Sequence, residues 1–138
     1  SPLVFLGFLY LWNFLIQNSL VAADAVISPV GCDIGTYKSV SQNIGIINNY
    51  KKDMDLNWSN FTIIPTLLEK SKLSAQIEAQ YRTMYPELIT TQSIRRAIKG
   101  QESIFYGASI IETDPSSPIA GDYFDTVSEV WGRIAGEE

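Results

Sequence analysis

Histidine is absent from the 138 residues, and cysteine occurs once, at Cys32. Without histidine the chain cannot build a Ser-His-Asp triad, a Cys-His pair or a histidine-based zinc site. One cysteine cannot form an internal disulfide or a cysteine-ligated metal cluster. The sequence also contains neither a glycine-rich phosphate loop nor a Gly-x-Ser-x-Gly motif. These absences predict a protein that is not an enzyme, has no metal site and takes no small-molecule substrate.

Positive charge is scarce: ten Lys and Arg stand against fifteen Asp and Glu, for a net charge of −5. Net charge is −2 over residues 1–37, +3 over 38–102 and −6 over 103–138. Binding to nucleic acid needs clustered Lys and Arg, so this distribution predicts no nucleic-acid partner. Arg95, Arg96 and Lys99 lie close together on one face of a predicted helix. We expect them either to be solvated or to contact an anionic lipid or an acidic neighbour.

The first 23 residues carry no charge. Residues 3–22, at about 1.5 Å each along a helix, would span about 30 Å, the thickness of the hydrocarbon core of a bilayer. We therefore predict that residues 1–23 form an uncleaved transmembrane helix. A retained secretory signal, with a small-residue cleavage pattern around Ala23, and a buried core helix are the alternatives.

Two polar side chains, Asn13 and Gln17, interrupt this apolar segment at a spacing of four residues, which places them on one helix face. Polar groups in lipid hydrogen-bond neighbouring helices, so this face predicts other membrane subunits as partners. An amide oxygen that ligates the magnesium of a chlorophyll-type pigment is the alternative; otherwise no cofactor is expected.

The first basic residue after the apolar segment is Lys38, so no positive charge holds the following chain in the cytoplasm. We therefore predict a single-pass membrane protein whose bulk lies on the lumenal or periplasmic side. Two consecutive glycosylation sequons begin at Asn57 and Asn60 and fit this location.

The remaining chain is predicted to be helical. Residues 24–35, rich in Pro and Gly, suggest a linker, and a lipidated Cys32 within it is a poor match to a lipobox. Beyond it, residues 36–138 form one predicted helical domain. Apolar residues recur at helical spacing in four stretches: about 37–56, 65–84, 91–111 and 117–135. The predicted fold class is all-α, one transmembrane helix followed by a bundle of three to four helices.

These features together predict a non-catalytic, single-span accessory subunit of a larger membrane complex of respiratory, photosynthetic or transport type. The alternative is an exported helical assembly protein of a secretion apparatus or surface filament, in which the apolar segment packs against copies of itself.

Overall fold

Two parallel strands form the centre of the computed structural model, which describes residues 4–6 and 12–136. Strand β1 (Ala25–Gly31) pairs with strand β2 (Asn60–Thr66) in the register Ala25 to Asn60 through Gly31 to Thr66. The helices are α1 (Phe14–Ala22), α2 (Ile34–Asp53), α3 (Lys72–Met84), α4 (Ile98–Tyr106), α5 (Ile110–Thr113) and α6 (Pro118–Ala135).

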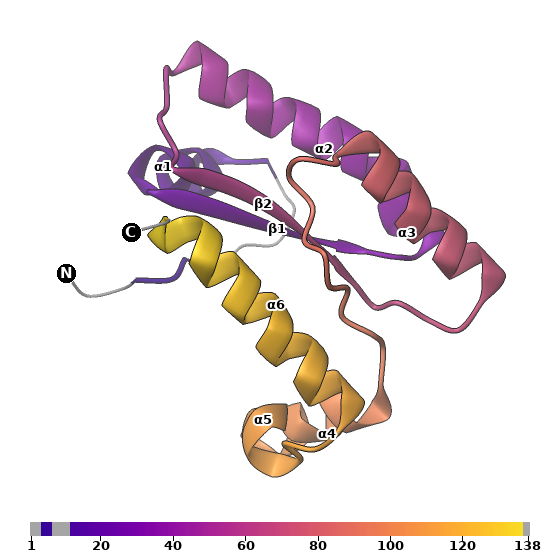
Figure 1. Ribbon diagram of the computed structural model, residues 1–138. Helices are drawn as coiled ribbons and strands as arrows, with labels where there is room; N and C mark the ends of the chain where they lie inside the picture. Colours follow the sequence, from indigo (N-terminus) through magenta and orange to yellow (C-terminus); the bar gives the residue numbers. More distant parts are fainter. Residues whose placement is uncertain (1–3, 7–11, 137–138) are drawn as a thin grey trace.

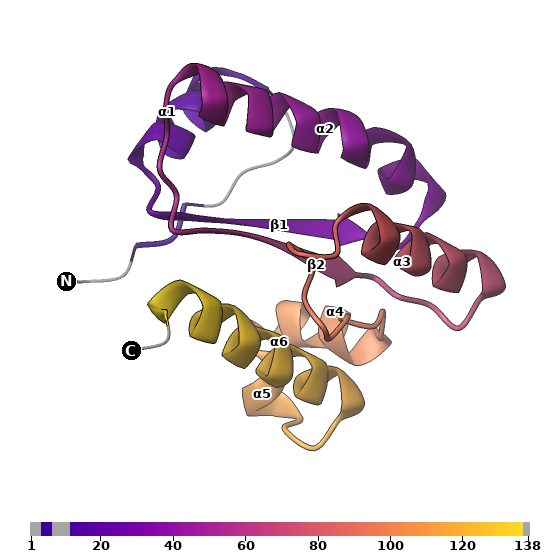
Figure 2. The ribbon, with the colours of Figure 1, turned by 45° about the horizontal axis from the view of Figure 1, so that its top comes forward.

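The helices lie in two layers, one on each face of the strands (Figures 1 and 2). Helix α2 connects β1 to β2 and packs above them with α1 and α3, whereas α4, α5 and α6 lie below. Helix α6 runs from the carboxyl end of the strands back toward their beginning, and its last turn lies near the start of β1 (Figure 1). The chain therefore has the helix-on-both-faces arrangement that parallel strands require.

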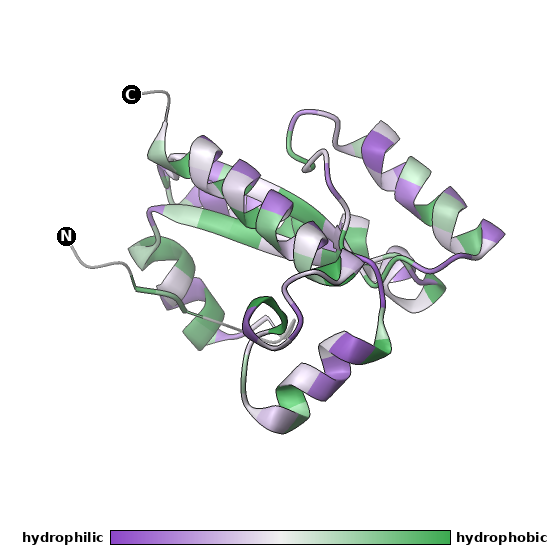
Figure 3. Cartoon of the chain, turned by 60° about the horizontal axis from the view of Figure 1, so that its bottom comes forward, coloured by the Kyte–Doolittle hydropathy of each residue, from purple (hydrophilic) through white to green (hydrophobic). Residues whose placement is uncertain are grey.

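Side chains alternate between the two faces of each strand. On the upper face, Val30 and Ile63 are fully buried in a core with Ile44 of α2 and Tyr81 of α3. On the lower face, Ile64 packs against a second core that α5 and α6 supply. Figure 3 shows the strands as an apolar band between helices of alternating hydropathy.

Side-chain caps fix where α2, α3 and α6 begin, among other helices. The Asp33 carboxylate accepts a hydrogen bond from the Thr36 N–H at 2.8 Å and begins α2. Ser71 caps α3, and Ser117 caps α6 immediately before its first residue, Pro118. Proline is well placed there because its ring pre-sets the helical φ and its missing N–H has no partner in a first turn. The predicted last helix, about 117–135, is confirmed.

A segment beyond β2 closes the free edge of that strand. The Ile63 N–H donates to the Leu88 carbonyl at 2.9 Å, and the Thr90 N–H donates to the Ile63 carbonyl at 2.9 Å. Farther along, the Ile94 N–H donates to the Pro65 carbonyl at 2.9 Å. Residues 88–96 thus run beside β2 and bring the following polar residues to the carboxyl end of the sheet.

The predicted all-α fold class is wrong, because β1 and β2 make the structure mixed α/β. Residues 25–31, placed in a predicted linker, form β1, and residues 60–66 form β2 where a loop and a helix start were expected. Pro65 was interpreted as the first residue of a helix. It lies in β2 instead, where its missing N–H faces residues 88–94 rather than β1, so no hydrogen bond between the two strands is lost.

The predicted transmembrane helix is also wrong. Within residues 4–6 and 12–136, no helix combines the length and the hydropathy that crossing a bilayer needs. Helix α1 covers only nine residues of the apolar segment, and it packs on α2 and on the loop before β2. The Trp58 indole donates a hydrogen bond to the Leu20 carbonyl at 2.8 Å, which fixes the end of α1. Residues 1–3 and 7–11 of the predicted span lie outside the described residues.

Candidate functional site

The carboxyl ends of β1 and β2 are held together by one buried hydroxyl. Ser74 in the first turn of α3 is 3% exposed; its Oγ donates to the Cys32 carbonyl at 2.9 Å and accepts from the Glu69 N–H at 3.0 Å. Cys32 directly follows β1, and Glu69 lies three residues after β2. The hydroxyl therefore fixes two loops that are 37 residues apart in the sequence, at the sheet edge where both strands end.

A cavity of about 290 Å³ opens at this edge. Leu67, in its wall, adopts a φ of 54° and is 51% exposed. The left-handed region costs a leucine about 1–2 kcal/mol, and such strain is concentrated at functional sites. The wall also contains Ile34 and Leu73, so it presents apolar side chains beside backbone groups. Its lining residues are Cys32, Asp33, Ile34, Leu67, Glu69, Ser71, Leu73, Ser74 and Arg96.

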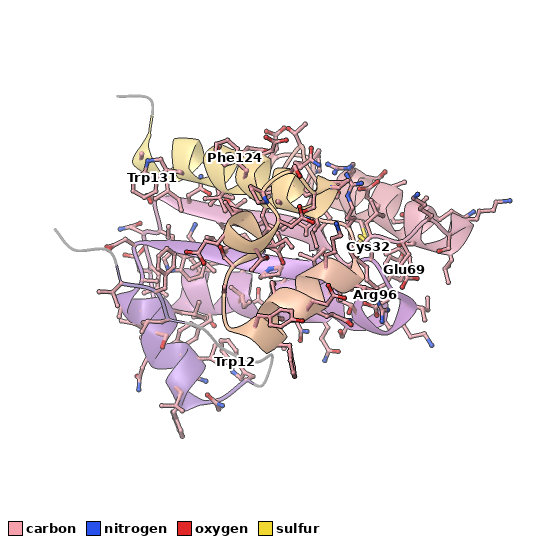
Figure 4. All side chains as sticks on the ribbon, turned by 90° about the horizontal axis from the view of Figure 1, so that it is seen from below. Trp12, Cys32, Glu69, Arg96, Phe124 and Trp131 are labelled. Carbon is pink, nitrogen blue, oxygen red and sulfur yellow. The ribbon has the colours of Figure 1, made fainter. Side chains whose placement is uncertain are left out.

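An ion pair closes one side of the cavity. The Arg96 guanidinium donates to the Glu69 carboxylate at 2.9 Å, and both side chains are about half exposed. Figure 4 shows Cys32, Glu69 and Arg96 close together on the side of the sheet where the strands end. Because the guanidinium is planar and remains solvent-accessible, it can stack on an aromatic ligand or bind an anionic one.

A second cavity, of about 450 Å³, lies next to the first and shares Glu69 with it. On its floor, Arg82 donates to the carbonyls of Thr90 at 2.7 Å and Thr91 at 3.1 Å. Arg82 also donates to the Ser93 hydroxyl, and that hydroxyl donates to the Glu78 carboxylate. These bonds occupy the Arg82 guanidinium, so its role in the structure is to hold residues 90–93 in place.

Asp122 of α6 anchors the far side of the second cavity. Its side chain is 4% exposed and accepts from the Arg95 guanidinium at 2.7 and 3.0 Å and from the Arg95 N–H at 3.1 Å. Gln92 donates to it as well, at 2.9 Å. Burial alone would raise the pKa of Asp122, but the hydrogen bonds from Arg95 outweigh burial and lower it. The carboxylate is therefore ionised and links α6 to the segment beyond β2.

Cys32 and Tyr81 lie beneath the site, and neither is available for chemistry there. Burial raises the pKa of the Cys32 thiol to about 11, and the nearby Glu78 carboxylate adds to the effect. Burial also raises the pKa of the Tyr81 phenol, whose O–H donates to the Gly31 carbonyl at 2.7 Å. A thiol that stays protonated is a poor nucleophile, so Cys32 is not poised for nucleophilic chemistry.

The residues predicted from the sequence lie elsewhere. Asn13 caps α1 by accepting from the Ile16 N–H at 3.0 Å, and Gln17 lies one turn further along; the proposed helix-packing or pigment face stays a prediction. Asn57 is exposed, and Asn60 is the first residue of β2. Asn60 accepts a hydrogen bond from Thr62, the fully buried hydroxyl of its own sequon. Glycosylation at both positions stays a prediction.

The three basic residues expected on one helix face each form an ion pair. Arg95 pairs with Asp122 at 2.7 Å, Arg96 with Glu69 at 2.9 Å and Lys99 with Asp114 at 2.5 Å. Each cation contacts a carboxylate from a different part of the chain.

Sequence reasoning missed Ser74, Leu67 and Glu69 as site residues. The available signal was the short apolar run of β2 ending in a polar segment, which is typical of a buried parallel strand. Pro65 within that run concealed it. Within the described residues no three His, Cys, Asp or Glu side chains gather to hold a metal ion.

The fold and the position of the cavities define an open parallel α/β protein. In this class, ligands bind outside the carboxyl ends of the strands. No protein-family model matches the sequence.

Known proteins similar to the chain are about twice its length. It is 26% identical over 121 residues to the "Chromosome-partitioning ATPase Soj" of Thermus thermophilus, covering 87% of this chain and 49% of that protein. It is 25% identical over 119 residues to the "Sporulation initiation inhibitor protein Soj" of Bacillus subtilis, covering 86% and 47%. The solved structure of apo McdA from Cyanthece matches 81% of this chain and 46% of its own, with a TM-score of 0.67 and 18% identity, and so supports the fold.

These similarities overturn the functional predictions from the sequence. The prediction of a membrane accessory subunit, and the alternative of an exported assembly protein, are wrong because the similar proteins are a chromosome-partitioning ATPase and a sporulation initiation inhibitor. The prediction that the protein is not an enzyme is contradicted by the similarity to an ATPase, and the exclusion of a nucleic-acid partner is contradicted on the same grounds. The predicted membrane subunits as partners, and the lumenal or periplasmic location, are contradicted by the same similarities, and the part of the chain that the structure describes contains no helix able to cross a membrane.

Proposed function

We propose that this chain supplies part of a Soj-type partitioning ATPase, and that the cavity between Leu67 and Arg96 receives the base of the nucleotide. The observation that carries the proposal is the similarity to the two Soj proteins over at least 86% of this chain. The cavity at the carboxyl ends of β1 and β2 is where a nucleotide binds in an open parallel sheet.

The chemistry of the cavity suits a base better than a phosphate. Leu67 and Leu73 offer apolar surface to the flat face of a purine, and the Arg96 guanidinium can stack on it. Around them, loop backbone atoms fixed by Ser74 offer hydrogen-bonding groups to its edge. The Glu69 carboxylate in the same wall repels phosphate. The sequence also lacks a glycine-rich phosphate loop. Hydrolysis therefore requires a phosphate-binding unit from outside these 138 residues.

The proposal is tested by titrating adenosine into the ¹⁵N-labelled chain and following the amide resonances. We expect weak, saturable binding with a dissociation constant of about 1 mM, equivalent to about 4 kcal/mol, because the phosphates are not engaged. The shifts should centre on residues 32–34, 67–69 and 93–96. Arg96→Ala should weaken binding severalfold, whereas Lys38→Ala, on the exposed side of α2, should leave it unchanged. Shifts confined to other regions, or none that saturate, would contradict the assignment.

A further inference from the structure

The lower face of β1 is not covered as the lower face of β2 is. Because side chains alternate, Ile27 and Pro29 point to the face opposite Val30, which is buried against α2. On that lower face β2 is sealed, with Thr62 fully buried and Ile64 packed in the core beneath it. Ile27 is 37% exposed and Pro29 is exposed. A parallel sheet is ordinarily covered on both faces, so, within residues 4–6 and 12–136, β1 lacks the helix that β2 has on this face.

Helix α6 has two opposite flanks of different character. On one flank, Glu129 accepts from the Thr91 N–H at 2.9 Å, and Arg133 donates to the carbonyls of Leu88 and Ile89 at 3.0 and 2.8 Å. This flank therefore faces the segment beside the outer edge of β2.

The other flank of α6 is apolar and exposed. Val127 and Trp131 each lie two residues before Glu129 and Arg133, which turns them about 200° around the helix. They are 60% and 54% exposed, and Phe124 next to them is 64% exposed. Since the charged flank faces the outer edge of β2, this apolar flank faces the β1 side. Figure 4, seen from below, shows α6 in front of the sheet, with Trp131 near the end of the helix.

We propose that a helix of a second α/β unit, the one that carries the phosphate loop in the proposed ATPase, packs against this flank of α6 and covers Ile27 and Pro29. The inference rests on the proposed function. The docking surface consists of Ile27, Pro29, Phe124, Val127 and Trp131. Soj relatives about twice as long as the chain contain enough additional sequence for such a unit.

A strand added to the outer edge of β1 would contribute less to the association of the two units than this helix. The Asp24 carbonyl and the Cys32 N–H, at the two ends of β1, both bond to the chain at β2. Since backbone groups alternate between the two edges of a strand, the even-numbered residues of β1 face β2, and Pro29 faces the outer edge, where it has no N–H to offer. The helix on the lower face therefore contributes most of the association, through burial of apolar area.

The test uses the whole chain joined to the half of the Thermus thermophilus Soj relative that it does not match, through a linker that a protease cuts after folding. No nucleotide is added. After cleavage the two halves should stay together, and the dissociation constant should rise at least tenfold in Val127→Asp and Trp131→Asp. Met54→Asp, half exposed in the upper layer, should change it less than twofold. Equal urea midpoints for all variants show that the fold is kept.

Three results would overturn the inference: halves that separate after cleavage, flank variants that bind as tightly as the unaltered chain, or a homodimer of the chain alone that Val127→Asp dissolves. Nucleotide binding is measured separately. A complex that depends on the flank but never binds ATP contradicts the proposed function alone. An active ATPase insensitive to Val127→Asp contradicts this inference alone.

Discussion

At the scale of single residues, the side chains that position the candidate site are buried polar groups with several partners each. Ser74 bridges two strand ends, and Asp122 receives four hydrogen bonds from Arg95 and Gln92. Removing one partner from such a group leaves the others unsatisfied, which costs more than an exposed interaction.

Asp122→Asn should lower the free energy of unfolding by about 2–3 kcal/mol, because the amide cannot satisfy the Arg95 guanidinium and backbone N–H together. The pKa of Asp122 lies below the ordinary 3.8, so its contribution is complete above that pH and is lost as pH falls through the lowered pKa. The difference between the two proteins in urea unfolding should therefore be constant at pH 5–7 and shrink below about pH 3.8.

Asp125→Asn is the matched control, since Asp125 lies on the exposed side of the same helix. It should change stability by no more than about 0.5 kcal/mol. A loss of stability equal to that of Asp122→Asn would show that the stability depends only on the total charge of helix α6.

Cys32 should react slowly with iodoacetamide in the folded chain. Its pKa of about 11, compared with 9.0 for a free thiol, lowers the thiolate fraction at pH 8 about 100-fold, and burial slows the reagent further. Alkylation in buffer and in urea, followed by mass spectrometry, measures the ratio of the reaction rates of the folded and unfolded chains. Equal rates in the two conditions would show that the sheet edge opens readily.

At the scale of elements, the sequence predicted α6 well, because its cap, its proline and its apolar spacing agree. The same reasoning failed for β1 and β2, which are short apolar runs interrupted by Pro29 and Pro65. A buried parallel strand needs no alternation of polar and apolar residues, so its pattern does not distinguish it from a linker or a helix start. The site residues depend on which strand ends meet, and spacing along the chain does not contain that information.

Helix α2 ends in a left-handed turn in which Asp55, rather than glycine, occupies the left-handed position. The Leu56 N–H donates to the Lys51 carbonyl and the Asp55 N–H to the Lys52 carbonyl, with Asp55 at a φ of 51°. Glycine is the residue that usually occupies this left-handed position.

Asp55→Gly should therefore stabilise the chain by about 0.5–1 kcal/mol, because glycine adopts the left-handed conformation without steric cost. Asp53→Gly, two residues earlier in the last helical turn, should instead destabilise it by about 0.5–1 kcal/mol. Chemical denaturation of both variants measures the opposite signs, and two changes of the same sign would refute the argument.

At the scale of the whole molecule, the two helical layers depend on different contacts. The upper layer closes on β1 and β2 through an apolar core around Ile63, whereas α6 in the lower layer is additionally joined to residues 88–95 by Asp122, Glu129 and Arg133.

Deleting residues 118–138 should release the segment 88–96 while the upper layer keeps much of its protection. Hydrogen exchange measured by mass spectrometry should show the largest increase at the amides of Thr91 and Arg95, whose acceptors Glu129 and Asp122 lie on α6. The rest of residues 88–96 should also exchange faster, because the Arg133 side chain no longer holds the carbonyls of Leu88 and Ile89. Trp131→Ala in the full chain should leave these amides protected, because that side chain is exposed on the opposite flank. Unchanged protection after the deletion would mean that β2 alone holds the segment.

The three ion pairs of Arg95, Arg96 and Lys99 differ in how they respond to dissolved salt. The carboxylates of Glu69 and Asp114 are 49% and 29% exposed and so are accessible to counterions, whereas that of Asp122 is 4% exposed. Screening weakens exposed pairs far more than buried ones. Rising ionic strength will therefore loosen the chain in stages. It frees Arg96 beside the cavity first, while the Asp122 anchor holds, so salt tunes the mobility of the site without unfolding the molecule.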